Sequence, residues 1–170
     1  MIADYKLYHG AVLAELVHGI VGSLSVDELS EEGRLSSYIL DGSVGLQVKH
    51  STQRLHPWPF TFTRANLGEL LTLRASYASV YVVLVCHTDG MVCVKLEELL
   101  DILSIGDSEQ AWIKVDRRKG KWYSLTGAAS SLPRKKPNGV DPIIETLAFR
   151  ADAQRTTGLQ SDFALSRLEG

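Results

Sequence analysis

The run SVYVVLVC, residues 79–86, constrains the fold more than any other feature because it is an almost unbroken series of β-branched and apolar residues. A strand with one face in water alternates apolar and polar residues, whereas a strand covered on both faces is apolar throughout. We therefore expect residues 79–86 to form the central strand of a sheet that other elements cover on both sides.

Apolar periodicity and turn residues predict the elements around this strand. Between the first helix and the first hairpin, Ser25 and Glu28 form a candidate capping box, so we expect a polar connection with a short helical turn there. The predicted helices cover 4–18, 64–75 and 96–103. The predicted strands cover 36–40 and 44–51, joined by a turn at 41–43, then 57–63, 91–95 and a hairpin over 111–125 with its tip at Lys119–Gly120.

The 170 residues most simply form one domain with a trailing segment. We assign residues 1–132, including the basic hairpin 111–125, to the domain, and residues 133–170 to a loop and helical extension. Helical spacing is weak over 142–150, and residues 151–170 are amphipathic at best. The extension can dock, remain disordered, or swap between two copies and so form a homodimer.

Composition sets the expected compartment. The chain is 45% hydrophobic and 22% charged, as ordinary globular proteins are. Its apolar runs are shorter than the roughly 20 residues that a membrane helix needs, and the start, MIADYKLYHG, lacks a signal-peptide pattern. We expect a cytoplasmic protein without membrane association.

The two cysteines, Cys86 and Cys93, flank the sequence HTDGMV. A two-residue turn at Asp89–Gly90 would place them directly across a hairpin, where a disulfide is sterically conceivable. In a chain without export signals, two reduced cysteines that pack as small apolar residues are the favoured interpretation.

Charge is distributed unevenly along the chain. The net charge of −2 combines −7 over residues 1–113, +7 over residues 114–136 and −2 over residues 137–170. A stretch this basic can contact phosphates, although a solvated hairpin tip is an equally good interpretation of charge alone. Aromatic residues on strands more often fill cores than stack on bases. Trp122 is the exception that we keep as a candidate for stacking on bases, because it lies among basic residues. The candidate nucleic-acid-binding residues are Arg117, Arg118, Lys119, Lys121, Arg134, Lys135 and Lys136.

The triplet Gln47-Val48-Lys49 in the strand GLQVKHS, followed by Phe60 and Phe62 and then by VYVVLVCHTDG, resembles the PD-(D/E)XK nuclease superfamily in its Q-x-K variant. The resemblance covers roughly residues 5 to 100. It implies an α/β fold with a restriction-endonuclease-like αβββαβ core, in which helices flank a mixed central sheet. The basic hairpin and the helical tail would be additions to that core.

The resemblance also implies a chemistry, the metal-dependent hydrolysis of phosphodiester bonds in DNA. In that family Gln47 would offer its carbonyl oxygen to Mg²⁺ or Mn²⁺, and Lys49 would position the attacking water or stabilise the pentavalent phosphate. Glu15, on the first helix, matches an additional acidic residue that many members supply. The implied catalytic residues are thus Glu15, Asp41, Gln47 and Lys49, and the implied metal ligands are Glu15, Asp41 and Gln47.

The sequence departs from the family at the aspartate of the first strand. That stretch reads Ser36, Ser37, Tyr38, and an even-length hairpin connection puts Ser36 and Tyr38 on the Gln47 face. The nearest carboxylate is Asp41, in the turn. Two hypotheses follow: a metal-dependent DNA endonuclease, or a catalytically degenerate module of the same fold that binds nucleic acid or a protein partner without cleavage.

Overall fold

A computed structural model describes residues 1–31, 34–104 and 110–168. The helices are α1 (Asp4–Gly19), α2 (Arg64–Ser76), α3 (Leu96–Ile102) and α4 (Asp141–Leu168). The strands are β1 (Val26–Glu31), β2 (Arg34–Leu40), β3 (Val44–Ser51), β4 (Trp58–Thr63), β5 (Ser79–Cys86), β6 (Gly90–Lys95), β7 (Gln110–Asp116) and β8 (Ser124–Gly127).

The strands form two sheets. In the five-stranded sheet the order is β1-β2-β3-β5-β6, and the pairing is antiparallel except between β3 and β5, which run parallel. The connection from β3 to β5 passes through β4 and α2. In the second sheet the order is β4-β7-β8, all antiparallel. The expected α/β class with a mixed sheet is confirmed.

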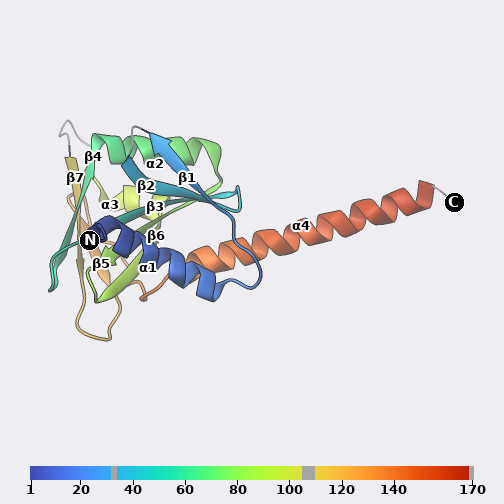
Figure 1. Cartoon of the computed structure of the whole chain (residues 1–170). Coiled ribbons are helices and arrows are strands. Elements are labelled where there is room, and N and C mark those ends of the chain that lie inside the picture. Colours follow the sequence, from blue (N-terminus) through green and yellow to red (C-terminus); the bar gives the residue numbers. More distant parts are fainter. Residues whose placement is uncertain (32–33, 105–109, 169–170) are drawn as a thin grey trace.

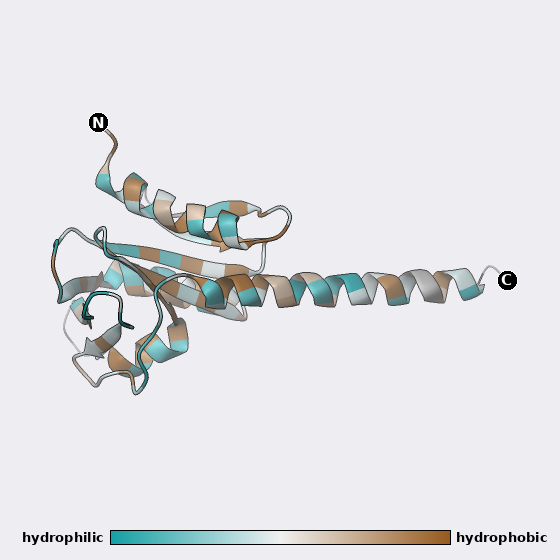
Figure 2. Cartoon of the chain, turned by 90° about the horizontal axis from the view of Figure 1, so that it is seen from below, coloured by the Kyte–Doolittle hydropathy of each residue, from teal (hydrophilic) through white to brown (hydrophobic). Residues whose placement is uncertain are grey.

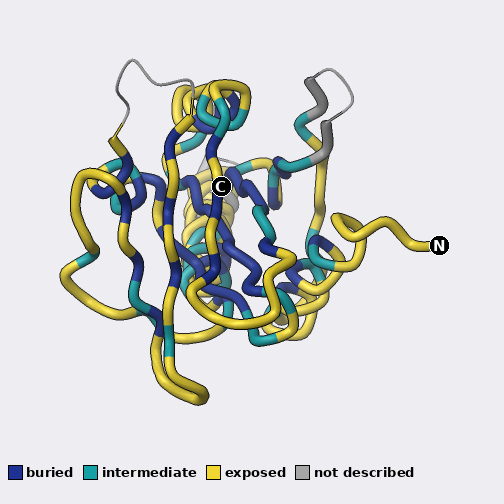
Figure 3. Tube along the Cα trace, turned by 90° about the vertical axis from the view of Figure 1, so that its left-hand side faces the viewer, coloured by how far each residue is buried: buried dark blue, intermediate teal, exposed yellow. Residues whose placement is uncertain are grey.

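The five-stranded sheet is the middle layer of the body (Figure 1). One face packs against α1 and the start of α4, through a cluster that includes Val12, Leu46, Val83 and Ile143. The other face packs against α2, α3 and the inner face of the second sheet. Buried segments gather in the interior of the body (Figure 3), so all of these layers share one compact unit.

Strand β5 is buried along its length, as its apolar sequence predicts. It is an interior strand, but the middle position of the sheet belongs to β3. At Gly45 of β3 a Cβ atom would lie 3.2 Å from side-chain atoms of Leu73, so the glycine lets α2 approach this strand closely. The triplet Gln47-Val48-Lys49 therefore lies on the central strand of the body, directly under a helix.

Two predictions about elements are wrong. The stretch after Ser25, expected as a polar connection with a helical turn, contains β1, which pairs with β2 at the sheet edge. The strand with the sequence WPFTFT, expected beside the triplet in one sheet, pairs with β7 in the second sheet. The expected helical extension, in contrast, is present as α4, which continues to Leu168, well beyond the weak helical signal of 142–150.

Helix α4 has two different halves. Val140, Ile143 and Leu147 are buried against the body, and Arg150 Nη2 lies 3.4 Å from Ser79 Oγ. Beyond that point the helix projects away from the body, with apolar and polar residues distributed around it (Figures 1 and 2). Residues 151–161 and 164–167 are exposed. No helix in the described part of the chain combines the length and apolarity needed to cross a bilayer.

The β5–β6 hairpin has a different register from the expected one. Its turn covers residues 87–89, so Cys86 pairs with Gly90, and Cys93 pairs with Val83. Cys86 lies in the core on the α2 face of the sheet, and Cys93 in the core on the α1 face. Both thiols are free and buried, which places the cysteines in separate cores and not across from one another.

Candidate functional site

The side chains of Gln47 and Lys49 project from the same face of β3, as strand alternation predicts. Leu46 and Val48 point the other way, into the core beneath α1. Gln47 and Lys49 therefore face α2, where both form hydrogen bonds with Asn66. The opening helix lies on the opposite side of the sheet.

Polar groups on this face of the sheet form hydrogen bonds with a buried carboxylate, that of Glu69 on α2. Its Oε2 atom accepts hydrogen bonds from Ser36 Oγ and Ser37 Oγ, each at 2.8 Å, and from Gln47 Nε2 at 3.2 Å. We call Ser36, Ser37, Gln47 and Glu69 the Glu69 cluster. A charged group in an apolar environment must be paired or hydrogen-bonded, and three donors meet that requirement here.

The register of β2 and β3 corrects the expected strand faces. The turn between them has three residues, Asp41 to Ser43, and Asp41 and Gly42 both have positive φ, at 49° and 61°. An odd connection places Ser37, and not Ser36, directly opposite Gln47. Ser37 thus occupies the position that faces the triplet, and it donates to Glu69.

Lys49 is tied to the first turn of α2. Its Nζ donates to Asn66 Oδ1 at 2.9 Å and lies 5.2 Å from the centre of the Phe62 ring. Asn66 Oδ1 also accepts from the backbone of Thr63, within the capping box that begins the helix. Burial lowers the pKa of Lys49 to about 8, an effect that the negative charge of Glu69 partly offsets. Lys49 therefore stabilises a helix start as well as facing the cluster.

One atom of the cluster has no partner. Gln47 is fully buried, its Nε2 donates to Asn66 O at 3.1 Å and to Glu69, and its Oε1 has no hydrogen bond to any described residue. If the side-chain amide of Gln47 were turned so that its oxygen and nitrogen exchanged places, the oxygen would face two hydrogen-bond acceptors. The orientation with Nε2 facing them is therefore the favourable one. Gln47 Oε1 is therefore a buried acceptor without a donor.

The structure does not bring Glu15 or Asp41 to Gln47 and Lys49. Glu15 is exposed on α1, across the sheet from the triplet. Asp41 lies in the β2–β3 turn, at the opposite end of β3 from Lys49, and its Oδ1 accepts from Ser25 N at 2.8 Å. The acidic residue beside the triplet is Glu69, from α2.

The donor set of the Glu69 cluster does not fit Mg²⁺ or Mn²⁺. These ions take about six oxygen ligands, usually carboxylates together with several waters. Glu69 is the one carboxylate that contacts Gln47 among the described residues, and its Oε2 already accepts three hydrogen bonds. The part of the chain that the structure describes contains no group of three or more His, Cys, Asp or Glu side chains placed to hold a metal.

Sequence reasoning missed Glu69, although a signal was present. Helical spacing from Asn66 through Glu69 and Leu70 to Leu73 defines the face of α2 that packs on the sheet. A glutamate at a position where leucines define the buried face indicates a partnered buried charge.

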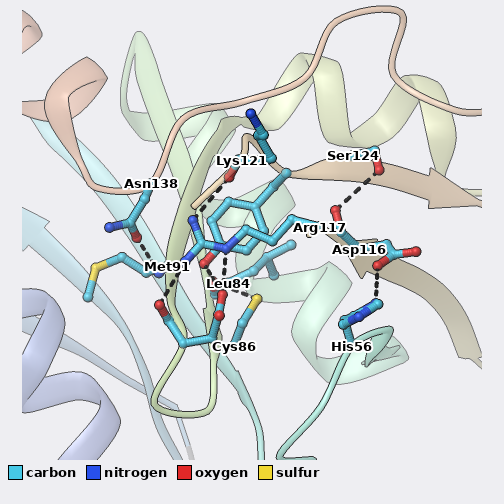
Figure 4. A network of polar contacts seen from close by, with 11 residues as sticks. His56, Leu84, Cys86, Met91, Asp116, Arg117, Lys121, Ser124 and Asn138 are labelled. Atoms are coloured by element: carbon cyan, nitrogen blue, oxygen red, sulfur yellow. Dashed lines mark hydrogen bonds and ion pairs between the residues drawn. The ribbon is translucent and has the colours of Figure 1, made fainter. Parts of the chain in front are cut away.

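The β7–β8 hairpin is pinned to the body by Arg117. Its Nε lies 2.6 Å from Asp89 Oδ2, its Nη2 donates to Asp89 O at 2.8 Å, and its guanidinium lies 4.1 Å from the centre of the Tyr123 ring. The hydroxyl of Tyr123 donates to the same carboxylate at 2.8 Å. Figure 4 shows this network, together with the hydrogen bond that the Met91 backbone amide donates to Asn138 Oδ1. Arg117 is thus occupied within the fold.

The other basic candidate residues differ in whether they form an ion pair. Lys136 Nζ forms an ion pair with Glu98 Oε1 at 2.5 Å. The remaining five are exposed and form no ion pair with the described residues. They are Arg118, Lys119, Lys121, Arg134 and Lys135, which we call the basic surface.

A cavity of about 710 Å³ opens at this surface. Its lining mixes basic side chains with an indole ring and a polar contact between His56 Nδ1 and Asp116 Oδ1, 2.5 Å apart. The lining residues are His56, Asp116, Arg117, Arg118, Gly120, Lys121, Trp122, Ser124 and Lys135. We call this the Trp122 cavity.

Comparisons with models of protein families, with curated proteins and with solved structures found no match for this chain. We therefore infer function from the residues of the Glu69 cluster and of the basic surface.

Proposed function

We propose that this protein binds nucleic acid through the basic surface and does not hydrolyse it. In this proposal the body is a restriction-endonuclease-like module, in which the strands β1, β2 and β3, the crossover helix α2 and the parallel strand β5 correspond to the αβββαβ core. The Q-x-K triplet keeps its position on the central strand and serves to hold that strand to α2.

The observation that carries the proposal is the concentration of exposed positive charge in one stretch of the chain, the β7–β8 hairpin and the loop that follows it. Residues 114–136 hold eight Lys and Arg against one Asp, and five of the eight form the basic surface. Exposed cations without carboxylate partners are free to replace the counterions of a phosphate backbone, and the release of those counterions drives nonspecific nucleic-acid binding. Arg117 and Lys136 support the surface from inside the fold.

Two observations favour binding over hydrolysis. Oε2 of the carboxylate nearest the triplet already accepts three hydrogen bonds, and Gln47 Oε1 is buried where a hydrated ion would have to reach it. A phosphodiester hydrolase of this kind needs an accessible ion and a water nucleophile.

The direct test measures fluorescence anisotropy of labelled oligonucleotides of about 20 nucleotides between about 50 and 200 mM salt. We expect binding that weakens steeply with salt, and weaker binding with a reduced salt slope in the double variant Arg118→Ala/Lys121→Ala. The matched control is Lys6→Ala/Arg74→Ala, which removes two exposed basic residues from helices outside the hairpin. Salt-insensitive binding, or equal effects of the two double variants, would refute the proposal.

A second experiment separates binding from hydrolysis. The protein and its Lys49→Ala variant are incubated with single-stranded and duplex DNA and with RNA, in Mg²⁺ or Mn²⁺. We expect the nucleic acid to stay intact with both proteins. Metal-dependent cleavage by the wild-type protein that disappears in Lys49→Ala would refute the proposal and show that the protein is a hydrolase.

A further inference from the structure

Trp122 is an exposed aromatic residue in the most basic part of the molecule. Its exposed fraction is 58%, whereas its neighbour Tyr123 is fully buried. Its ring lines the Trp122 cavity beside Arg118, Lys121 and Lys135. An indole left in water amid cations offers a flat apolar surface next to groups that bind phosphate.

The backbone on both sides of Trp122 is fixed. Arg117 Nη1 donates to Lys121 O at 3.1 Å, and the Lys121 amide donates to Arg118 O at 2.9 Å. On the other side, Tyr123 and Lys136 exchange two backbone hydrogen bonds, at 2.7 and 2.8 Å. The indole is therefore presented by an ordered tip, so a ligand that binds it would not have to order the loop.

The outer face of β7 continues this surface along the second sheet. Trp112, with an exposed fraction of 45%, and Lys114 alternate with the buried residues Ile113 and Val115 and share the solvent face. A strand rises about 3.4 Å per residue, so this face extends the basic surface by more than 10 Å. Trp112 and Lys114 thus add one aromatic ring and one cation to this face, which ends with Asp116 before the hairpin tip.

We infer that the Trp122 cavity binds single-stranded nucleic acid, with an unpaired base stacked on Trp122 and flanking phosphates on Arg118, Lys121 and Lys135. The inference rests on the proposed function and adds its substrate class. The faces of paired bases are covered inside a duplex, whereas every base of a single strand has a free face for an aromatic ring. The cavity has the size that bound organic groups occupy, about 300 to 1,000 Å³.

The test compares oligo-dT of about 20 nucleotides with a duplex of equal length, for the wild-type protein and for Trp122→Ala. We expect wild type to prefer the single strand. Loss of one stacked base should weaken single-strand binding by about 5- to 150-fold. Because no phosphate contact is lost, the salt slope of Trp122→Ala should equal that of wild type and duplex binding should change little. Trp122→Phe should recover part of the affinity.

The control variant is Phe149→Ala, which removes an aromatic side chain 76% exposed on α4, outside the basic surface. It should bind as wild type does. Duplex binding as tight as single-strand binding, or equal affinity of Trp122→Ala and wild type for oligo-dT, would overturn the inference. If Arg118→Ala/Lys121→Ala still weakens binding in that case, the proposed function survives and only the single-strand assignment fails. If neither variant changes binding, both fail.

Discussion

Gln47 Nε2 lies 3.2 Å from Glu69 Oε2, so the central strand β3 and helix α2 are joined through a buried carboxylate. The same oxygen accepts the hydroxyl groups of Ser36 and Ser37 from β2. The hairpin of β2 and β3 and the later helix α2 therefore meet at one atom. The polar face of β3 has a structural role that needs no ligand.

Replacing Glu69 with glutamine should destabilise the fold. The amide keeps the volume but accepts weaker hydrogen bonds than a carboxylate, and it adds a buried donor among existing donors. We expect a loss of about 1 to 3 kcal/mol in the free energy of unfolding, measured in urea by tryptophan fluorescence. Glu97→Gln, at an exposed position of α3, should change it by less than about 0.5 kcal/mol. Equal stability of the two variants would contradict this role of Glu69.

Lys49 should make the protein more stable as the pH rises above neutrality. Its pKa is about 8 in the folded state and 10.5 in the unfolded reference, so between these values the unfolded state binds more protons. Unfolding free energy should increase by about 1 kcal/mol between about pH 7.5 and 9.5, after allowance for partial exposure. The increase should disappear in Lys49→Met and persist in Lys114→Met, which alters an exposed lysine. An identical pH profile in all three proteins would refute the assignment.

His9 should make the protein acid-sensitive. Its side chain is 4% exposed, with Nδ1 2.7 Å from Tyr38 OH, and its ring lies near Tyr5 and His50. Burial, and then the charge of His50, lowers the pKa of His9 to about 4 from 6.5. Between these values the unfolded state binds more protons, so stability falls as the pH drops, by about 2 kcal/mol from pH 7 to 5.

The measurement is urea unfolding at the two pH values for wild type, His9→Gln and His18→Gln. His18 is exposed on the same helix, so its variant should keep the wild-type acid sensitivity. His9→Gln should lose most of it. A pH dependence that survives His9→Gln would assign the effect to other groups.

Arg117 and Arg118 are adjacent but should have separable roles. Arg117→Ala removes the partner of Asp89 and should lower the free energy of unfolding by about 2 kcal/mol or more. Arg118→Ala should leave stability within about 0.5 kcal/mol of wild type. It should weaken single-strand binding and reduce the logarithmic salt slope by about 0.7. Unfolding curves and salt titrations of the two variants check this division; matching profiles would contradict it.

Elements with strong local patterns could be predicted from the sequence. The helical spacing of α1 and α2 and the apolar run of β5 define these elements to within a residue or two. Strand β1 escaped prediction because it is an edge strand that begins with the exposed residues Val26, Asp27 and Glu28, so backbone pairing with β2, and not side-chain burial, defines it. The separation of β4 into a second sheet also depends on pairing with β7, about 50 residues away, which no local pattern encodes.

The candidate site was predictable only in part. Alternation along β3 correctly placed Gln47 and Lys49 on one face. The register of β2 depended on a three-residue turn with two left-handed residues, and an even connection was the assumption. Glu69 joins Ser37 and Gln47 across 32 and 22 residues of sequence, so its partners follow from the packing of α2 and not from a motif.

Helix α4 leaves the body after its buried first turns, and residues 151–161 and 164–167 are exposed. Exposed segments with few buried contacts open with little free energy, so their amides should exchange with deuterium rapidly while those of β5 stay protected. At 1.5 Å per residue, this outer half reaches roughly 25 Å from the globular unit. A fluorophore or surface anchor attached there would report on the molecule without disturbing the folding of its interior.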